Sequence, residues 1–419
     1  MSYIENSEFN ALKTASSLGA LTVLDRILVV APDFPYPPTD GARVDIWERL
    51  KILVHVARKI ELVVTVKSNP DHAALSRVRE IADRVSIVNR RKNLRSLLSL
   101  RPFQLTSRIG LNSIPISGNF DAVLLEGEYV SGILENPNLK TTLVILRVHN
   151  NSMRNFQQLA KSERNPLRRA FYLAEAARSG RLFCRVARAS DLLWFISQNE
   201  YKEYVEAHPE QEMIASFVPP SIGEIRPYVG PRTQNCALFI GTLGLAPNAR
   251  AIEWFLSNVH GRLNGIPGYR LIIAGNTLGN PIDRIYRAAN GYSNVEIYQN
   301  PNNTAELYET ASVFINPVMH GTGVKLKTID AIRAGLPVVS TSIGAEGTGL
   351  VHGEHILIAD SPNDFADALN AILLDISLGE RLVRQSQSFL QMHYDYEKAI
   401  RRSLKIRSAD FLHQDSKWP

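Results

Sequence analysis

Short apolar runs alternate with amphipathic stretches along most of this chain. In its first half, runs of mainly apolar residues predict strands at 26–32, 61–66, 85–89, 120–126, 143–148 and 191–197. The stretches at 45–59, 71–84 and 152–188 carry apolar residues at helical spacing. Unbroken apolar strands between helices are typical of a parallel sheet that helices cover on both faces. The first half is therefore predicted to be a doubly wound α/β domain.

A change in composition divides this alternation into two parts. Residues 217–232 hold four prolines and two glycines in sixteen residues, which is typical of a linker. The alternation then resumes, with predicted strands at 237–241, 270–276, 295–299, 313–317, 337–341 and 355–359. Segment 388–407 predicts one long amphipathic helix. We predict two doubly wound domains, 1–216 and 233–387, joined by linker 217–232 and followed by a C-terminal helix and tail, 388–419, that could return to the first domain.

Composition restricts the class of protein. Of 419 residues, 45% are apolar and 21% are charged, which excludes a disordered or fibrous chain. Two cysteines exclude a disulfide framework and favour a reducing compartment. No apolar run reaches the ~18 residues of a membrane helix, and the first residues do not have the pattern of a secretory signal. A cytoplasmic location is expected.

Charge is distributed unevenly along the chain. Residues 1–200 hold 28 Lys+Arg and 19 Asp+Glu, a balance of +9, whereas residues 201–419 hold 19 and 22, a balance of −3. Two basic stretches stand out, 84–108 with seven basic residues and no acid, and 161–188 with eight basic residues and two acids. Arginines beside leucines in 84–108 favour peripheral docking on an anionic membrane, with a solvated charged face as the alternative. Nucleic acid is not expected, because no aromatic side chains interleave these arginines.

The segment 317–347 carries the clearest chemical signal. A Gly-Thr-Gly turn at 321–323 follows a predicted strand and precedes a helix that ends at Gly335. Glycines let backbone N–H groups approach an anion, and the start of a helix adds a partial positive charge. Lys325 adds a full positive charge, so the segment predicts a site for a diphosphate. The alternative is a plain turn, with Lys327 and Asp330 as an exposed i,i+3 ion pair.

With these residues the chain resembles the group 1 retaining glycosyltransferases, which have the two-Rossmann (GT-B) fold and are typified by bacterial polysaccharide and lipopolysaccharide enzymes. The resemblance includes the glycines and lysines of 321–327, the helix end A-x-x-x-G-x-P-V-V at 331–339, and the segments RILVVAPDFPYPPTDGARVDIWERL, LRVHN and FIGTLGLAPNARAIEWF. It spans nearly the whole chain in the family's order. It implies an α/β GT-B fold in which the first domain binds the acceptor and the second binds a nucleotide-diphosphate sugar.

The resemblance also implies roles for individual residues. His149 and Lys325 are expected to be catalytic, and Asp330 is expected to bind the ribose. The donor diphosphate and sugar are expected to contact Gly41, Gly241, Thr242, His320, Gly321, Thr322, Gly323 and Val324. Two of these positions depart from the family pattern, which commonly has one acid at the glycine turn and one in the following helix. The first position is His320 here, and the second is Asp330 rather than glutamate. The donor sugar is therefore expected to be read differently than in typical members.

Three residues at predicted strand ends of the first domain complete the candidate set. His149 follows the strand 143–148, where the alternative is a histidine bonded to a backbone group. Glu126 ends the strand 120–126 and Glu128 follows it, and both could bind acceptor hydroxyls or a metal, with a solvated loop as the alternative. No Asp-x-Asp motif occurs, so no metal or other cofactor is expected.

The sequence thus favours a metal-independent, retaining glycosyltransferase. Its partners would be a nucleotide sugar, a glycan or lipid-linked acceptor and, at its periphery, the inner face of an anionic membrane. A nucleotide-sugar epimerase on the same fold is one alternative, and a two-lobed sugar-binding protein without enzymatic activity is another.

Overall fold

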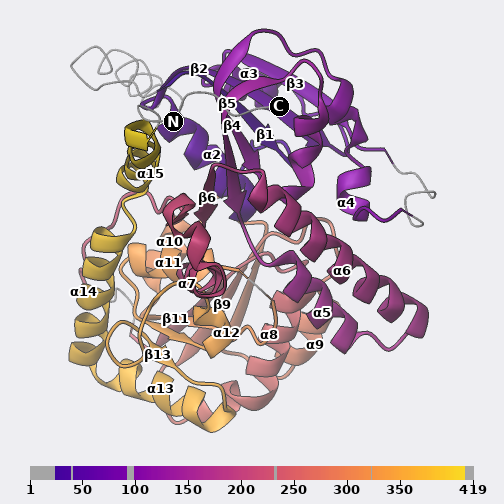
Figure 1. The fold of residues 1–419 in the computed structure, drawn as a ribbon. Helices are drawn as coiled ribbons and strands as arrows, with labels where there is room; N and C mark the ends of the chain where they lie inside the picture. The colour runs from indigo at the N-terminus through magenta and orange to yellow at the C-terminus, as the bar shows by residue number, and fades with distance from the viewer. Residues whose placement is uncertain (1–23, 39–40, 92–98, 231–233, 322, 411–419) are drawn as a thin grey trace. The chain divides into compact units, whose positions relative to one another are not determined.

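The computed structural model describes residues 24–38, 41–91, 99–230, 234–321 and 323–410. The chain forms two compact units (Figure 1). The first holds the described residues up to Ile196, with Glu203–Val218 and the last helix from Tyr396 onward. The second holds Ser197–Lys202 and Pro219–Asp395.

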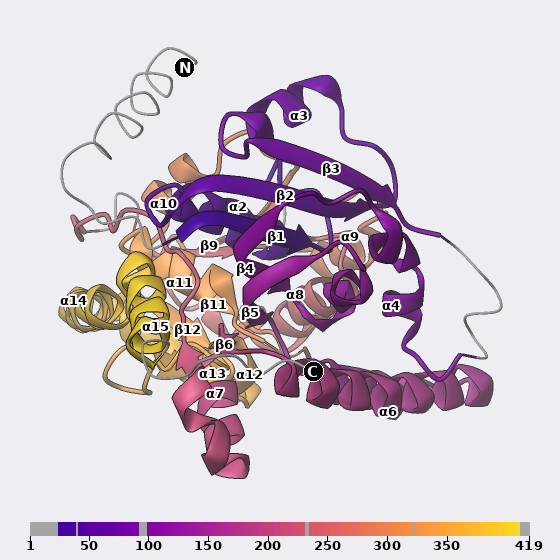
Figure 2. The same cartoon turned by 45° about the horizontal axis from the view of Figure 1, so that its top comes forward.

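The first unit is built on a parallel sheet with the strand order β3-β2-β1-β4-β5-β6-β7. Figure 2 shows β3, β2, β1, β4 and β5 side by side. The strands are β1 (Leu24–Ala31), β2 (Ala57–Val66), β3 (Arg84–Asn89), β4 (Asn119–Glu126), β5 (Lys140–Val148), β6 (Leu192–Phe195) and β7 (Ala215–Phe217). The register pairs Val29 of β1 with Leu62 of β2 and with Leu124 of β4, so the buried runs of adjacent strands are aligned. The expected doubly wound parallel sheet is confirmed.

Helices flank this sheet and close its core. They are α2 (Gly41–Leu53), α3 (His72–Arg79), α4 (Phe103–Thr106), α5 (Ser152–Ser162), α6 (Pro166–Arg188) and α15 (Tyr396–Asp410), with 3-10 turns η2 (Ile109–Ser113), η3 (Glu128–Glu135) and η4 (Pro209–Ile214). Helix α7 (Gln198–Ala207) is divided, since its residues up to Lys202 belong to the second unit. The last helix, α15, packs Tyr396, Ile400 and Leu404 into the core of this unit. The indole N–H of Trp194 on β6 donates to Ser403 Oγ over 2.8 Å, which fixes α15 against the sheet.

The second unit repeats the plan with the strand order β10-β9-β8-β11-β12-β13. Its strands are β8 (Cys236–Ile240), β9 (Arg270–Gly275), β10 (Val295–Gln299), β11 (Val313–Asn316), β12 (Val338–Ser340) and β13 (Leu357–Ile358). Its helices are α8 (Ala246–Asn258), α9 (Asp283–Ala289), α10 (Ala305–Thr310), α11 (Leu326–Arg333), α12 (Ser342–Ala345), α13 (Pro362–Leu374) and α14 (Ile376–His393), with η5 (His260–Leu263). Two doubly wound α/β units confirm the predicted fold class.

Three predicted helices have different bounds in the structure. The helix predicted at 45–59 ends at Leu53, because residues from Ala57 onward pair with β1 as part of β2. The stretch 152–188 forms two helices, since Asn165 caps a new helix with Pro166 in its first turn. The segment 388–407 is not one helix: α14 ends at His393 and packs in the second unit, whereas α15 packs in the first.

None of the described helices combines the length and the apolar content that a membrane span requires.

Candidate active site

The second unit has its topological switch point between β8 and β11. The chain passes from β8 to β9 on one side of the sheet and from β11 to β12 on the other. Ligands of open α/β sheets bind beyond the carboxyl ends of the strands at such a point. The turn after β8 begins at Gly241, and the turn after β11 contains the Gly-Thr-Gly sequence. Both predicted donor segments therefore lie at one edge of this sheet.

Two close backbone approaches shape the turns after β8 and β9. A Cβ on Gly275 would lie 1.7 Å from the carbonyl oxygen of Gly241, and a Cβ on Gly244 would lie 1.8 Å from that of Thr277. Any side chain at Gly275 or Gly244 would therefore collide with rigid backbone. The Thr242 carbonyl accepts the Asn248 side-chain amide over 2.8 Å, which ties the first of these turns to α8.

Lys325 lies at the start of α11 with the glycine turn folded around its ammonium group. Its Nζ donates to the carbonyls of Gly321 over 3.2 Å and Gly323 over 2.7 Å. Both glycines have positive φ, +119° and +80°, which L side chains rarely adopt. The ammonium lies 3.7 Å from a carboxylate oxygen of Glu346. Burial lowers the pKa of Lys325, and Glu346 opposes that shift.

Lys327 provides a second ammonium group that the sequence did not place in the site. Its Nζ donates to Asn248 Oδ1 over 2.5 Å and lies 4.8 Å from the centroid of the Phe239 ring. It is also 3.2 Å from the position of a Cβ on Gly241. Burial, followed by repulsion from Lys325, lowers the pKa of Lys327 to about 7. In the described part of the chain no carboxylate forms an ion pair with this lysine.

The exposed Lys327–Asp330 ion pair, the alternative for this segment, is wrong. Asp330 instead lies 3.7 Å from Arg333 Nε, and its side chain is 46% exposed. Lys327 turns to Asn248, a residue 79 positions earlier in the chain. His320 and Val324 lie in the loop between β11 and α11, and Thr322 lies outside the described residues.

The first unit has a second cluster at its own switch point, between β1 and β4. Helix α2 follows β1 and supplies Asp45 and Arg49, while Glu126 ends β4. Arg147 lies near the end of β5, and His149 follows that strand. The cluster thus joins three segments that are far apart in the sequence and that the parallel sheet brings to one edge.

Arg49 and Arg147 hold the two carboxylates of this cluster. Arg49 Nε and Nη2 donate to the two oxygens of Glu126 over 2.5 and 2.9 Å, and Nη2 also pairs with Asp45. Arg147 Nη2 donates to Asp45 Oδ1 over 3.1 Å. Another Arg49 nitrogen, Nη1, donates to the hydroxyl of Tyr396 on α15. All four charged side chains are buried, so the two acids are neutralised without help from water.

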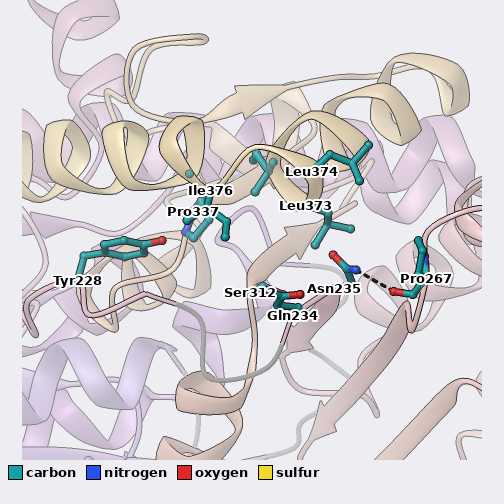
Figure 3. Close-up of a pocket in the computed structure, with 11 residues that line it drawn as sticks. Tyr228, Gln234, Asn235, Pro267, Ser312, Pro337, Leu373, Leu374 and Ile376 are labelled. Carbon is teal, nitrogen blue, oxygen red and sulfur yellow. Dashed lines mark hydrogen bonds between the residues drawn. The ribbon is translucent and has the colours of Figure 1, made fainter.

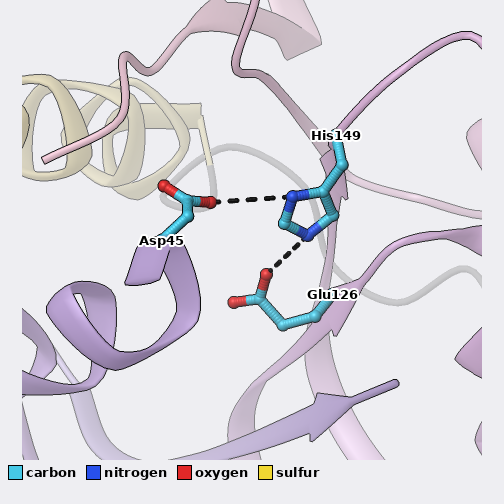
Figure 4. Close-up of side chains that lie close together, drawn as sticks. All are labelled: Asp45, Glu126 and His149. Carbon is cyan, nitrogen blue, oxygen red and sulfur yellow. Dashed lines mark hydrogen bonds and ion pairs between the residues drawn. The ribbon is translucent and has the colours of Figure 1, made fainter. Parts of the chain in front are cut away.

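His149 lies between the two carboxylates (Figure 4). Its Nε2 is 3.0 Å from Glu126 Oε2, and its Nδ1 is 3.6 Å from Asp45 Oδ2. The alternative of a histidine bonded to a backbone group is therefore wrong. The imidazole is 21% exposed, whereas both carboxylates are fully enclosed. The cluster thus consists of one partly accessible imidazole ring and a buried network of four charged side chains.

The electrostatics keep both acids of the cluster ionised. Burial alone would raise the pKa of Asp45, but Arg147, Arg49 and His149 together hold that pKa well below its usual range. The pKa of Glu126 is likewise lowered, because Arg49 and His149 outweigh its burial.

Glu128 differs from Glu126 in its surroundings. It is 5% exposed and accepts the Ser152 hydroxyl over 2.5 Å, so the solvated-loop alternative is wrong for both glutamates. Burial raises the pKa of Glu128. Gly41, the remaining candidate of this unit, is exposed at the first position of α2.

Asp45, Glu126 and His149 also form a group with the donor atoms of a metal site. One ligand atom from each lies within 4.8 Å of the others. Arg49 and Arg147 already occupy the carboxylate oxygens, however, and a divalent cation would add charge beside two buried guanidinium groups. The donor set fits a metal by geometry and disfavours it by charge.

A separate cavity of about 380 Å³ lies at the opposite edge of the second sheet (Figure 3). Among its lining residues, Asn235 precedes β8, Ser312 precedes β11 and Pro337 precedes β12. It therefore lies at the amino ends of the strands. The donor turns follow the carboxyl ends, so this cavity is not part of the candidate site.

The sequence did not predict that Arg49, Arg147 and Asp45 belong to this buried network. Arg147 is fully buried inside the otherwise apolar run 143–148, a signal that the apolar pattern alone does not interpret. Asp45 and Arg49 have i,i+4 spacing on one helix, which usually indicates an exposed pair. Asn248 and Glu346 had no local signal.

Three comparisons with known proteins show which family and fold this chain resembles. Residues 234–375 match the family model described as glycosyl transferases group 1. An uncharacterized 44.6 kDa protein in the cps region of Klebsiella pneumoniae is 32% identical over 387 residues, covering 90% of this chain and 98% of the relative.

Solved structures resemble the whole described fold. TarM of S. aureus, in complex with UDP and α-GlcNAc-glycerol, has a TM-score of 0.64 at 9% identity and covers 91% of this chain and 99% of its own. Anabaena HepE in complex with UDP and glucose has a TM-score of 0.61 at 13% identity, covering 92% and 100%. WaaG, a glycosyltransferase involved in lipopolysaccharide biosynthesis, has a TM-score of 0.60 at 13% identity, covering 91% and 99%. With its sequence match in the second unit and this fold, the chain belongs to the group 1 glycosyltransferases and has the GT-B fold.

Proposed function

We propose that this protein transfers a sugar from a nucleotide-diphosphate sugar to a glycan or lipid-linked acceptor, with retention of the anomeric configuration, in the synthesis of a cell-surface polysaccharide. The observation that carries the proposal is the pair of partly buried ammonium groups, Lys325 and Lys327, beside a glycine turn at the switch point of the second unit. The similar protein encoded in a cps region and WaaG supply the context of the pathway.

The donor diphosphate would bind at the start of α11. Bond cleavage places negative charge on the leaving diphosphate, and preorganised cations stabilise that charge most effectively where water is excluded. Lys325 and Lys327 would supply this stabilisation, with the backbone of Gly321 and Gly323 close to the phosphates. Asp330 would bind the ribose. The complexes of HepE and TarM with UDP support a uridine nucleotide as the first donor to test.

His149 would contact the donor sugar from the first unit. Asp45 and Glu126 flank its ring and fix its orientation, so they act as positioning residues. Neither carboxylate is arranged as a nucleophile, because Arg49 and Arg147 bind both. Same-face attack with retention, in which the leaving phosphate takes the acceptor proton, therefore fits the site better than double displacement. Glu128 would form a hydrogen bond with a hydroxyl group of the acceptor substrate.

A donor screen followed by a transfer assay tests the function. A bound nucleotide sugar at ~100 times its dissociation constant should stabilise the fold by ~2.7 kcal/mol in a thermal-shift measurement. Free nucleoside diphosphate should then appear only when acceptor is added, and NMR of the product should show the anomeric configuration of the donor. A product sugar altered at another carbon without acceptor would indicate the epimerase, and binding without turnover would indicate the sugar-binding protein.

Activity is expected to survive chelation of metals. Because Arg49 and Arg147 already neutralise Asp45 and Glu126, excess EDTA should change kcat by less than about twofold. The measurement is the initial rate of transfer with and without EDTA. Abolished turnover that Mg²⁺ or Mn²⁺ restores would contradict this and make Asp45, Glu126 and His149 the first residues to test as metal ligands.

Donor binding is expected to be linked to the protonation of Lys327. With a pKa of about 7, this lysine is about nine-tenths neutral at pH 8. A diphosphate beside it favours the charged form, so binding of UDP at pH 8 should take up close to one proton, and affinity should fall as pH rises from 7 to 9. Calorimetry in buffers of different ionisation enthalpy measures this uptake. An uptake that is unchanged in Lys327→Met would contradict the assignment.

Docking on an anionic membrane at the inner face stays a prediction, and the segment expected to carry it, 84–108, is described only in part. Arg90 points inward and donates to the carbonyl of Pro32, and Arg101 pairs with Glu135 at 2.9 Å. Residues 92–98 lie outside the described residues. The second basic stretch forms α6, where Leu167 is exposed beside exposed arginines. We therefore propose α6 as the contact region.

A further inference from the structure

A small pocket in the first unit is lined by charged and polar side chains that the proposed donor site does not use. It measures about 300 Å³ and lies beyond the carboxyl ends of β1 and β2. Its lining includes Asp33, Tyr36, Arg43, Lys67 and Asn69. This volume is at the lower end of small-molecule sites, with room for one sugar and its substituent. The pocket shares the strand-end edge of the sheet with His149.

Among the described residues, Arg43 and Lys67 line this pocket together with Asp33 and Asp71, and two further arginines lie close to Asp33 or to the residue before it. Arg43 Nη2 lies 3.2 Å from Asp33 Oδ2, and Arg90 Nη2 lies 4.0 Å from the same oxygen. The other acid in the lining, Asp71, accepts the backbone N–H of Ala74 over 2.7 Å as the cap of α3. Exposed Lys67 balances the charge of Asp71. Asp33 is therefore shared by more than one guanidinium group.

A third guanidinium group, that of Arg108, contacts the carbonyl of Pro32, the residue before Asp33 of the lining. Its Nε donates to Thr65 Oγ1 over 3.0 Å and its Nη2 to the carbonyl of Pro32 over 3.4 Å. Arg90 donates to the same carbonyl, so the two guanidinium groups are neighbours. Arg108 is only 4% exposed. The nearest further acid is Glu128, which burial makes a weaker acid.

This arrangement is electrostatically unfavourable as it stands. Burial and then repulsion from Arg90 lower the pKa of Arg108 to about 10. Burial also lowers the pKa of Arg90, with Asp33 opposing the shift and Arg43 adding to it. The Nε of Arg90 is buried and has no hydrogen-bond partner within the described ranges. An anion bound in the pocket, beside Arg43 and Asp33, would reduce this repulsion.

We propose that this pocket binds an oxyanion on the acceptor, a phosphate ester or a sugar carboxylate. The proposal rests on the proposed function, because it names the class of acceptor that the first unit takes. Guanidinium groups form short, charge-assisted hydrogen bonds with both kinds of oxyanion. An anion held beyond β1 and β2 would anchor the acceptor on the same edge that carries His149.

A binding measurement that needs no turnover tests this inference. Full-length protein carrying Lys325→Ala, which weakens the predicted donor site, is titrated calorimetrically with glucose 1-phosphate, with glucuronate and with glucose. At least one anion should bind, while neutral glucose should not. Arg43→Gln should raise the dissociation constant of that anion about tenfold. Arg58→Gln, at the opposite end of β2 and 71% exposed, is the matched control and should leave it unchanged.

Each outcome decides one question. Binding of the phosphate alone identifies a phosphate ester as the anchor, and binding of glucuronate alone identifies a carboxylate. If neither anion binds, or if Arg43→Gln binds as tightly as its parent, the inference is overturned. Lys67→Gln provides a second variant at an exposed position, where folding is not at risk, and should weaken binding about threefold. If the protein binds the anion but the wild type transfers no sugar in the transfer assay, the proposed function is refuted and the anion site stands.

Discussion

Replacing Lys325 with alanine is expected to lower kcat/KM by about 10²-fold or more. The substitution removes a charge that would stabilise the leaving diphosphate, and it frees the carbonyls of Gly321 and Gly323 that the ammonium holds. Most of the loss should appear in kcat, because charge develops on the diphosphate mainly in the transition state. Steady-state kinetics with a donor identified by the screen measure both constants.

Two further variants separate charge from folding in this experiment. Arg262→Ala removes an exposed cation from η5 of the same unit and should leave kcat/KM unchanged. Lys325→Arg keeps the charge and should recover part of the rate. Near wild-type turnover in Lys325→Ala would refute the assignment of the donor site.

Replacing Arg49 with methionine is expected to destabilise the protein by about 3–5 kcal/mol at pH 7. The substitution leaves Asp45 and Glu126 buried with one guanidinium group, Arg147, in place of two. Urea denaturation of the full chain measures the change. Arg58→Met removes an exposed pair with Asp25 and should cost about 0–1 kcal/mol at most.

The pH dependence of this loss has a definite sign. The pKa values of Asp45 and Glu126 are lowered in the folded protein, so their pairing stabilises it above their unfolded pKa values and this stabilisation fades as pH falls. The difference between wild type and Arg49→Met should therefore be largest near pH 7 and smaller below about pH 4. Adding Glu126→Gln to the variant should recover part of the stability. Equal stability of Arg49→Met and wild type would show that the buried network contributes nothing net.

The features that the sequence predicted correctly are local ones. Apolar runs predicted the strands because most of these runs are buried, although β3 and β10 are only partly buried. The turn at 321–323 predicted the position of Lys325 because the helix follows immediately. The three-residue strand β7 is too short to produce such a pattern.

The features that the sequence could not predict depend on distant partners. Arg49 and Glu126 are 77 residues apart, and Arg147 and Asp45 are 102 apart, so only the folded sheet brings them together. Lys327 had a plausible neighbour at i+3, but Asn248 offered an acceptor inside the fold. The end of α14 was missed for the same reason, because the apolar positions before and after it pack in different units.

Helix α15 belongs to the first unit but follows the second unit in sequence, which restricts how this enzyme can be cut into separately expressed fragments. A fragment that stops at Val218 contains all seven strands of the first sheet but lacks Tyr396, Ile400 and Leu404 from its core. It also loses the hydroxyl that Arg49 contacts and the serine that binds Trp194. A shortened C-terminus would therefore damage the buried charged network that contacts His149, more than 240 residues away in sequence. Separate expression of the first unit requires residues 396–410 to be joined back to it.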